Sequence, residues 1–385
     1  MKLLQFRTLW GVIDECDGES ARSPAKALEE TVLLLKRLGF DGIELPYKLF
    51  LHLGVERVAK LLKEQQMKIN LMIMTDNVLC PGTGILWGGP HARPLGGDVV
   101  YSTPAQPGDS VKLSGEELVS KHVAVFREQV EDISKLAMHP EIALPVHIVN
   151  SHSGRDFFSQ QMAETFFSEA LAIERHCGYN QPLAGEEEKV YPRLQLCHET
   201  HRSRILYSPW LTRDLMKRVP GIRLCADFSH WVCTAESMDA DLCAAIHEVC
   251  PFVIHTHCRV GHEQGSQVPD PRTEEWSGHV SSHEVWWDAI WQVQKARGDA
   301  TSCLIAEHGP PPYQPCQPGP TREPLAKIWE VNHWVHARRQ KRFRELFPAD
   351  DCSSLVEEEL LRVGWSPQKD VKTDTKTVSE MAKAA

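Results

Sequence analysis

The chain has 385 residues, a formal net charge of −10 at pH 7 and a sequence pI near 6.0. This length allows a large buried core, and α/β barrels commonly reach it within a single domain. The acidic balance argues against a surface that neutralises phosphate backbones, because proteins that bind nucleic acid usually present a basic face. We therefore expect no nucleic-acid partner.

Cysteine usage and the N-terminal residues bear on the cellular compartment. The 12 cysteines include no C-x-x-C pair, and many stand in apolar stretches, which suits small buried residues in a reducing compartment. The first residues lack the apolar core of a signal peptide, and no stretch approaches the ~18 apolar residues of a membrane span. We expect a cytoplasmic protein with no membrane partner.

Hydrophobic periodicity in the first part of the chain predicts strand, helix, strand, helix and strand in turn. Ser23-Pro24 marks the start of the first helix, and Gly39 marks its end. The predicted ranges are 3–13, 24–39, 40–45, 55–66 and 68–74. Residues 75–114 are rich in glycine and proline but carry no nucleotide-binding motif, so we expect a functional or disordered loop there.

The alternation of strands and helices continues beyond this loop. Ser114-x-x-Glu117 is a capping box that predicts a long helix ending before Pro140, and Ser281-x-x-Glu284 is assigned to the start of a tryptophan-rich helix. Further strands are predicted at 145–150, 193–199, 222–227, 252–257 and 301–307, and further helices at 158–177, 211–219, 239–249 and 321–344.

Eight strands alternating with about eight helices predict an α/β fold of the (β/α)8 TIM-barrel type. The barrel is expected to span residues 1–347 as a single domain, with long loops at its C-terminal face, at 75–114 and 258–282. Residues 348–385 are expected to add a short helix and then a disordered tail, because they contain little that could be buried.

Four consecutive predicted strands, the fifth to the eighth, end in residues that can bind a metal ion. The strand ends are His198-Glu199, Asp227, His255-Thr256-His257 and Glu307-His308. A charged group at the end of a buried strand is costly unless it is paired or coordinated. Since the carboxyl ends of barrel strands meet at one face, these endings predict a single shared cation.

Several motifs together resemble the xylose isomerase-like superfamily of sugar phosphate isomerases and epimerases, which are TIM barrels. The resemblance covers about residues 3–345. It is carried by Phe40-Asp41-Gly42-Ile43-Glu44-Leu45, His198-Glu199-Thr200-His201, Asp227-Phe228-Ser229-His230, His255-x-His257 and Glu307-x-Gly309-Pro310-Pro311. It implies that Glu199, Asp227, His257 and Glu307 bind one divalent cation.

The chemistry of this set can also be argued from its residue types. Three carboxylates and one imidazole form an oxygen-rich site that suits Mn²⁺ first, with Mg²⁺, Co²⁺ or Zn²⁺ as alternatives. A cation that polarises a substrate carbonyl acidifies the adjacent C–H bond and stabilises the enediolate formed when the proton leaves. As the resemblance implies, Glu199 and Glu307 are the expected catalytic pair, one taking the proton and the other returning it.

Other polar residues near the same strand ends are candidates for substrate binding. His255 and His257 point the same way by the alternation of a strand, and the resemblance favours His257 as the ligand and leaves His255 beside the substrate. Glu44 is interpreted as a structural carboxylate near the site. Arg259 would suit a carboxylate or phosphate on the substrate, although a surface salt bridge is the alternative. The candidate substrate-binding residues are His230, Asn150, His152, Arg259 and His255.

We therefore predict a metal-dependent isomerase or epimerase of a sugar or sugar-derived keto compound. A metal-dependent dehydratase, which is a lyase on the same barrel, is the first alternative, because both reactions begin with the same proton abstraction. A zinc-dependent apurinic-site endonuclease is less favoured by the acidic balance, and a barrel that has lost its chemistry is also left open. The expected partner is a small-molecule sugar or keto acid, and assembly into a homo-oligomer is left open.

Overall fold

The computed structural model describes residues 1–12, 24–75, 114–180, 194–311, 313–318 and 324–350. Eight strands pair in parallel in sequence order, and β1 also pairs with β8, so the sheet closes into a barrel. The strands are β1 (Lys2–Thr8), β2 (Gly42–Pro46), β3 (Lys68–Met74), β4 (Val146–His152), β5 (Gln195–Glu199), β6 (Leu224–Ala226), β7 (Val253–Cys258) and β8 (Thr301–Ala306). The predicted (β/α)8 barrel is confirmed.

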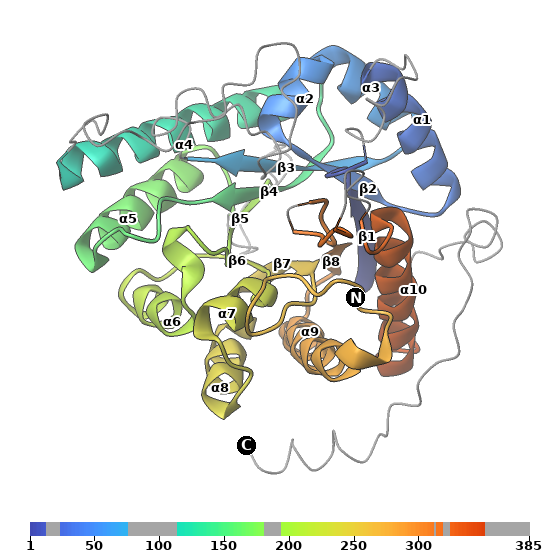
Figure 1. Ribbon diagram of the computed structural model, residues 1–385. Helices are drawn as coiled ribbons and strands as arrows, with labels where there is room; N and C mark the ends of the chain where they lie inside the picture. The colour runs from blue at the N-terminus through green and yellow to red at the C-terminus, as the bar shows by residue number, and fades with distance from the viewer. Residues whose placement is uncertain (13–23, 76–113, 181–193, 312, 319–323, 351–385) are drawn as a thin grey trace.

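The helices surround the ring of strands (Figure 1). They are α1 (Pro24–Arg37), α2 (Tyr47–Leu53), α3 (Val55–Glu64), α4 (Gly115–Met138), α5 (Gln160–His176), α6 (Pro209–Arg218), α7 (Phe228–Ala235), α8 (Ala240–Val249), α9 (Ser277–Arg297) and α10 (Ile328–Leu346). Short 3-10 turns lie at Ile205–Tyr207, Cys250–Phe252 and Glu274–Trp276. The sequence analysis did not predict α2 and α7, and it placed the start of α10 too early.

One of the two predicted capping boxes is present in the structure, and the other is not. Ser114 and Glu117 form the expected capping box, in which each side chain accepts a hydrogen bond from the other residue's backbone N–H. The assignment of Ser281 to a helix start was wrong, because α9 already begins at Ser277. The Ser281 hydroxyl lies inside the helix and donates to the Ser277 carbonyl at 2.9 Å, as serines in helix interiors often do.

The barrel has two apolar regions. The larger one fills the space between the sheet and the helices, and the smaller one lies inside the ring of strands. The inner cluster consists of Leu4, Phe6, Ile148, Cys197, Cys225, Cys303 and Ile305. Gly42 permits this packing, because a Cβ there would lie 2.3 Å from the Phe6 ring and 2.4 Å from the Lys68 carbonyl oxygen. Three buried cysteines, Cys197, Cys225 and Cys303, are therefore core residues of this inner cluster, as expected.

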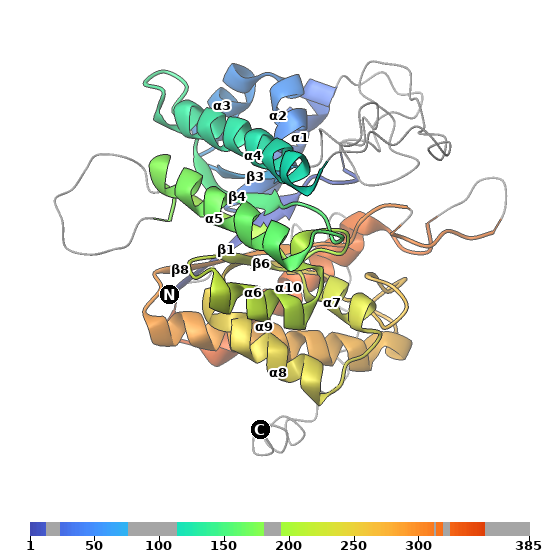
Figure 2. The same cartoon turned by 90° about the vertical axis from the view of Figure 1, so that its left-hand side faces the viewer.

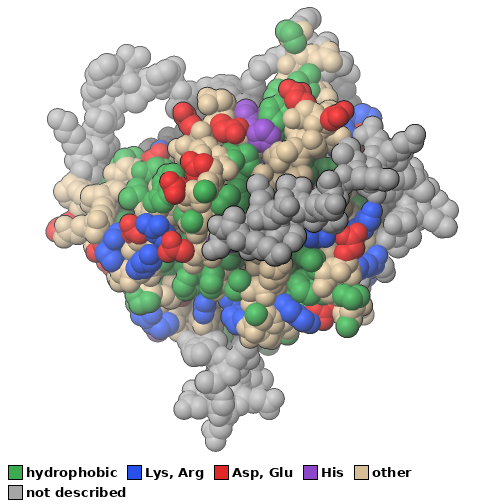
Figure 3. Space-filling model, turned by 90° about the horizontal axis from the view of Figure 1, so that it is seen from below, with side chains coloured by type: hydrophobic (Ala, Val, Ile, Leu, Met, Phe, Trp, Pro, Cys, Tyr) green, Lys and Arg blue, Asp and Glu red, His purple; other side chains and the backbone are tan. Residues whose placement is uncertain are grey.

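In the side view the N-terminus lies at one end of the barrel, and the segment that follows β8 lies at the other (Figure 2). On the face seen in Figure 3, basic and acidic side chains are interspersed, and that face shows no broad basic area. None of the helices in the described ranges is long and apolar enough to cross a membrane. Most of the predicted loop at 75–114 and nearly all of the predicted extension at 348–385 lie outside the described residues.

Candidate metal centre

The four residues that the resemblance implied as ligands lie together at the C-terminal face of the barrel. Glu199 ends β5, Asp227 follows β6, His257 lies near the end of β7, and Glu307 follows β8. One ligand atom from each lies within 4.8 Å of the others. All four side chains are almost completely buried, with exposures of 4% or less. The strands therefore bring three carboxylates and one imidazole to a common point.

Two atoms of this group approach each other closely without forming a hydrogen bond. His257 Nδ1 lies 2.7 Å from Glu307 Oε2. Neither atom has a hydrogen-bond partner in the described structure, although both are buried. Buried polar groups are rarely left unsatisfied, and those that are call for an explanation. A 2.7 Å ion-pair contact between two buried donor atoms that lacks hydrogen-bond geometry fits two ligands of a shared cation.

Asp227 serves both a helix and the site. Its Oδ1 accepts hydrogen bonds from the backbone N–H and the hydroxyl of Ser229 and thereby caps α7. Its Oδ2 accepts from Arg259 Nε at 3.0 Å. Burial, with additional repulsion from Glu307 and Glu199, raises the pKa of Asp227 to about 6 despite the nearby guanidinium. Protons therefore compete for this carboxylate in the metal-free site.

Glu199 is held by two of the predicted substrate-binding residues. Its Oε2 accepts a hydrogen bond from Asn150 Nδ2 at 2.6 Å and lies 2.9 Å from His152 Nε2, both on β4. Burial alone would raise the pKa of Glu199, but the imidazoles of His152 and His257 outweigh that effect and hold it well below its usual value. Glu199 is therefore an ionised carboxylate.

Arg259 is buried within the site rather than exposed on the surface. Its Nη2 lies 2.8 Å from Glu307 Oε1, and its Nε bonds Asp227, so its guanidinium bridges two of the ligand candidates. It also stacks near the rings of Trp10 and Tyr313, at 5.4 and 4.8 Å from their centroids. Arg259 therefore lies in the site, as predicted, but the two carboxylates that it contacts belong to the protein rather than to a substrate.

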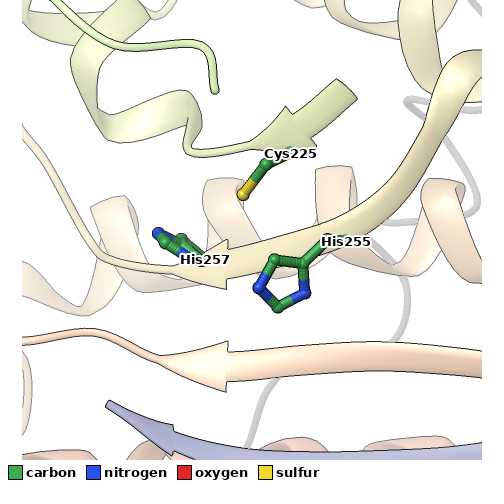
Figure 4. A group of neighbouring side chains, drawn as sticks. All are labelled: Cys225, His255 and His257. Carbon is green, nitrogen blue, oxygen red and sulfur yellow. The ribbon is translucent and has the colours of Figure 1, made fainter. Parts of the chain in front are cut away.

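His255 lies one layer below His257, deeper in the barrel. Figure 4 shows the two imidazoles on β7 with the Cys225 sulfur directed toward them from β6. The Nε2 atoms of both imidazoles lie 3.3 Å from Glu44 Oε2 on β2. Burial favours the neutral imidazole, but the neighbouring Cys303 and Glu44 raise the pKa of His255 to about 9. The lower layer is therefore internally charge-paired, which is how buried charges are normally tolerated.

Two strand-end histidines point away from the metal centre. His198 alternates with Glu199 along β5, and its Nε2 lies 2.9 Å from Glu174 on α5. His308 contacts Gln314 and Gln267 instead. Of the residues named at the strand ends, these two therefore belong to the packing around the barrel.

Two further histidines form a pair beside Glu199, and only one of them was predicted. His230 is the predicted one, and the centroid of its ring lies 3.9 Å from that of His201. Both histidines lie close enough to Glu199 for the three residues to bind one metal ion. Burial lowers the pKa of each imidazole well below its usual value, so both are neutral. The signal for His201 was its place two residues after Glu199, which the sequence analysis quoted without assigning a role.

The fold and this cluster together define a (β/α)8 barrel with a candidate cation centre at its C-terminal face. Once His257 is neutral, as a metal ligand must be, the three carboxylates and the Arg259 guanidinium leave two negative charges, which a divalent cation would balance.

Solved structures to which the chain is similar include three with related chemistry in their names. The probable 3-DHS dehydratase AsbF of Bacillus anthracis is 15% identical with a TM-score of 0.42, over 78% of this chain and 92% of that one. D-psicose 3-epimerase of Clostridium cellulolyticum is 11% identical with a TM-score of 0.44, over 86% and 91%. D-allulose 3-epimerase of Methylomonas sp. is 11% identical with a TM-score of 0.47, over 80% and 85%.

These likenesses are distant, and the barrel assignment depends on the strand order itself. No protein-family model matches the chain, and no curated protein matches it.

Proposed function

We propose that this protein is a divalent-metal-dependent isomerase or epimerase of a sugar or sugar-derived keto compound. The observation that carries the proposal is the convergence of His257 Nδ1 and Glu307 Oε2, 2.7 Å apart and both without a hydrogen bond, within a buried set of three carboxylates and one imidazole. Oxygen-rich sites of this kind suit Mn²⁺ best among the expected cations, with Mg²⁺, Co²⁺ or Zn²⁺ as alternatives.

The ligands proposed are Glu199, Asp227, His257 and Glu307. When bound there, a divalent cation polarises the substrate carbonyl and acidifies the adjacent C–H bond. Glu199 is the proposed base. The hydrogen bond from Asn150, together with the neighbouring His152, keeps its carboxylate ionised and fixes its orientation.

Glu307 is the proposed second proton carrier. It directly follows β8, which pairs with the strand that carries His257. Its Oε1 contacts Arg259, and its Oε2 lies beside His257 Nδ1. A proton that returns to the original carbon from the opposite face gives epimerisation. A proton that returns to the neighbouring carbon gives aldose–ketose isomerisation. The same pair of carboxylates can serve both outcomes.

The proposal is tested by the metal content of the purified protein and by deuterium uptake from D₂O. The substrates are a panel of ketoses, keto acids and their phosphates. We expect one cation per chain and exchange at one carbon of a panel member. Glu199→Gln is expected to lower that exchange by about 100- to 10,000-fold, the usual contribution of general base catalysis. Glu248→Gln, which alters an exposed ion pair on α8, is the control and should not affect exchange.

Three zinc ions per chain would instead favour the endonuclease alternative. A protein that binds no cation and exchanges no deuterium would remove the basis for an enzyme at this site.

A dehydratase remains the second candidate, and the position of His230 favours it. In an elimination of water, the proton that Glu199 takes from carbon can pass to the departing hydroxyl, and a neighbouring hydrogen-bond donor holds that hydroxyl in place. His230 lies beside Glu199 with both ring nitrogens free of hydrogen bonds in the described structure. Mass analysis of the product separates the two reactions, because a dehydratase product lacks one water and an isomerase product keeps the mass of its substrate.

A further inference from the structure

One guanidinium near the candidate metal centre has no carboxylate partner among the residues that the structure describes. Arg202 follows β5 by three residues and is half-buried. Its Nη1 makes a weak contact with the Cys233 sulfur at 4.0 Å, and its guanidinium carbon lies 5.0 Å from the centroid of the Tyr313 ring. No carboxylate of the described residues forms an ion pair with it. Arg259, which stacks on the same ring, is engaged by Asp227 and Glu307.

The charges around the site make Arg202 the residue that is left unmatched. The three ligand carboxylates and Arg259 together carry two negative charges, which a divalent cation neutralises. The Arg202 guanidinium, which lies over the same Tyr313 ring as Arg259, is then a positive charge that no carboxylate of the described residues pairs.

Groups with free hydrogen-bonding capacity lie between Arg202 and the cation ligands. Tyr313 Oη lies 3.5 Å from His201 Nε2, and both nitrogens of His230 lack a hydrogen bond in the described structure. Such groups suit the hydroxyl and carbonyl oxygens of a sugar-derived molecule. The guanidinium suits a planar carboxylate, which it can bind through two parallel hydrogen bonds.

We infer that the substrate is a monoanion, a hydroxy-keto acid derived from a sugar, whose carboxylate is bound by Arg202. This inference rests on the proposed function and specifies its substrate class. A neutral ketose would leave the guanidinium unmatched. A phosphate ester carries about 1.5 to 2 negative charges at pH 7 and exceeds the single charge available.

The test compares three compounds that differ only at the terminal carbon: D-fructose, D-fructuronate and D-fructose 6-phosphate, with the corresponding tagatose series as a second set. Metal-loaded full-length protein is used, and both deuterium exchange and binding by calorimetry are measured. The variants are Arg202→Met, which keeps the apolar part of the side chain, and Arg202→Lys, which keeps the positive charge but lacks the paired N–H donors of the guanidinium. Arg213→Met removes an exposed ion pair on α6 and serves as the control.

We expect the uronate to be preferred and Arg202→Met to weaken its binding by about 10- to 100-fold, as for the loss of a hydrogen-bonded charge. In Arg202→Met, the KM for the uronate should rise and its kcat should change little, and the kinetics with the neutral ketose should not change. Arg202→Lys should retain part of the preference for the uronate.

Equal losses for uronate and ketose, or an Arg202-dependent preference for the phosphate ester, would overturn the carboxylate assignment. Binding of the uronate that depends on Arg202, without any exchange, would contradict the proposed function alone. Exchange that is indifferent to Arg202 would contradict this inference alone.

Discussion

Two layers of polar residues lie inside the C-terminal half of the barrel, and His257 belongs to two candidate metal-binding groups, one with the upper layer and one with Cys225 and His255 of the lower layer. The upper layer consists of Glu199, Asp227, His257 and Glu307, and its atoms converge without satisfying one another. The lower layer, with Cys225, His255 and Glu44, pairs an ionised carboxylate with imidazoles. Proximity of ligand atoms is therefore not enough to identify a cation site. The unmatched negative charge distinguishes the upper layer, because the Glu44 carboxylate of the lower layer is paired with the imidazole of His255.

The largest expected effect comes from removing a ligand of the upper layer. Asp227→Asn should abolish measurable Mn²⁺ binding in equilibrium dialysis, because a neutral amide replaces a charged oxygen ligand. The fold should be retained, since asparagine caps helices about as well as aspartate. Asp239→Asn is the matched control, because Asp239 caps α8 in the same way but lies outside the site. Cation binding that survives in Asp227→Asn would contradict the proposed ligand set.

The next effect concerns the contact between the layers. Glu44 Oε2 lies 3.3 Å from His257 Nε2, which leaves Nδ1 of the same ring facing the cation site. A carboxylate in this position orients the ligand and fixes its tautomer, and its loss typically costs 10- to 100-fold in metal affinity. We expect Glu44→Gln to weaken cation binding by about 10- to 100-fold.

A matched control for Glu44 exists on the outside of the barrel. Glu174 makes the same kind of contact with His198, at 2.9 Å, but neither residue faces the site. Glu174→Gln should leave cation affinity unchanged. Equal losses in the two variants would indicate a general effect on the stability of the barrel.

Cation affinity should also rise with pH. Asp227, with a pKa near 6, must lose its proton before it can bind a cation. The carboxylates around His257 raise its pKa well above its usual value despite its burial, so a bound cation displaces that proton too. Calorimetry in two buffers of different ionisation enthalpy should therefore detect proton release at neutral pH. Affinity that does not change between pH 5 and pH 8 would argue against these two ligands.

The smallest effect is expected in the lower layer. Cys225→Ala should leave cation affinity unchanged, because burial raises the pKa of this thiol well above its usual value and disfavours the thiolate that metals bind. The free energy of unfolding should fall by about 1 kcal/mol, a typical value for a single substitution. A large loss of metal in this variant would reverse the comparison between the layers.

The sequence was informative where the site residues stand at the ends of predicted strands. Strand ends in a parallel barrel share one face, so three acids and one histidine at the ends of four consecutive strands could be placed together from the sequence. Lys68–Met74 was predicted with its observed bounds for the same reason, because alternating apolar residues mark a strand.

Contacts across the barrel interior could not be predicted in this way. Glu44 on β2 reaches His255 and His257 on β7, and nothing in the local sequence specifies that meeting. Helix α7 was not predicted, because it has only eight residues and its start depends on the cap that the Asp227 side chain provides. That Arg202 has no ion pair among the described residues, whereas Arg259 has two, could be seen only from the contacts in the structure.

The closure of the ring has a consequence for the order of folding. Lys2 on β1 pairs with Thr301 on β8, and such distant contacts are slow to form because a long loop must close first. All four proposed ligands lie between residues 199 and 307, on strands that are neighbours in both sequence and space. A cation would therefore stabilise the second half of the barrel before the first strand docks, and refolding in its presence should begin there.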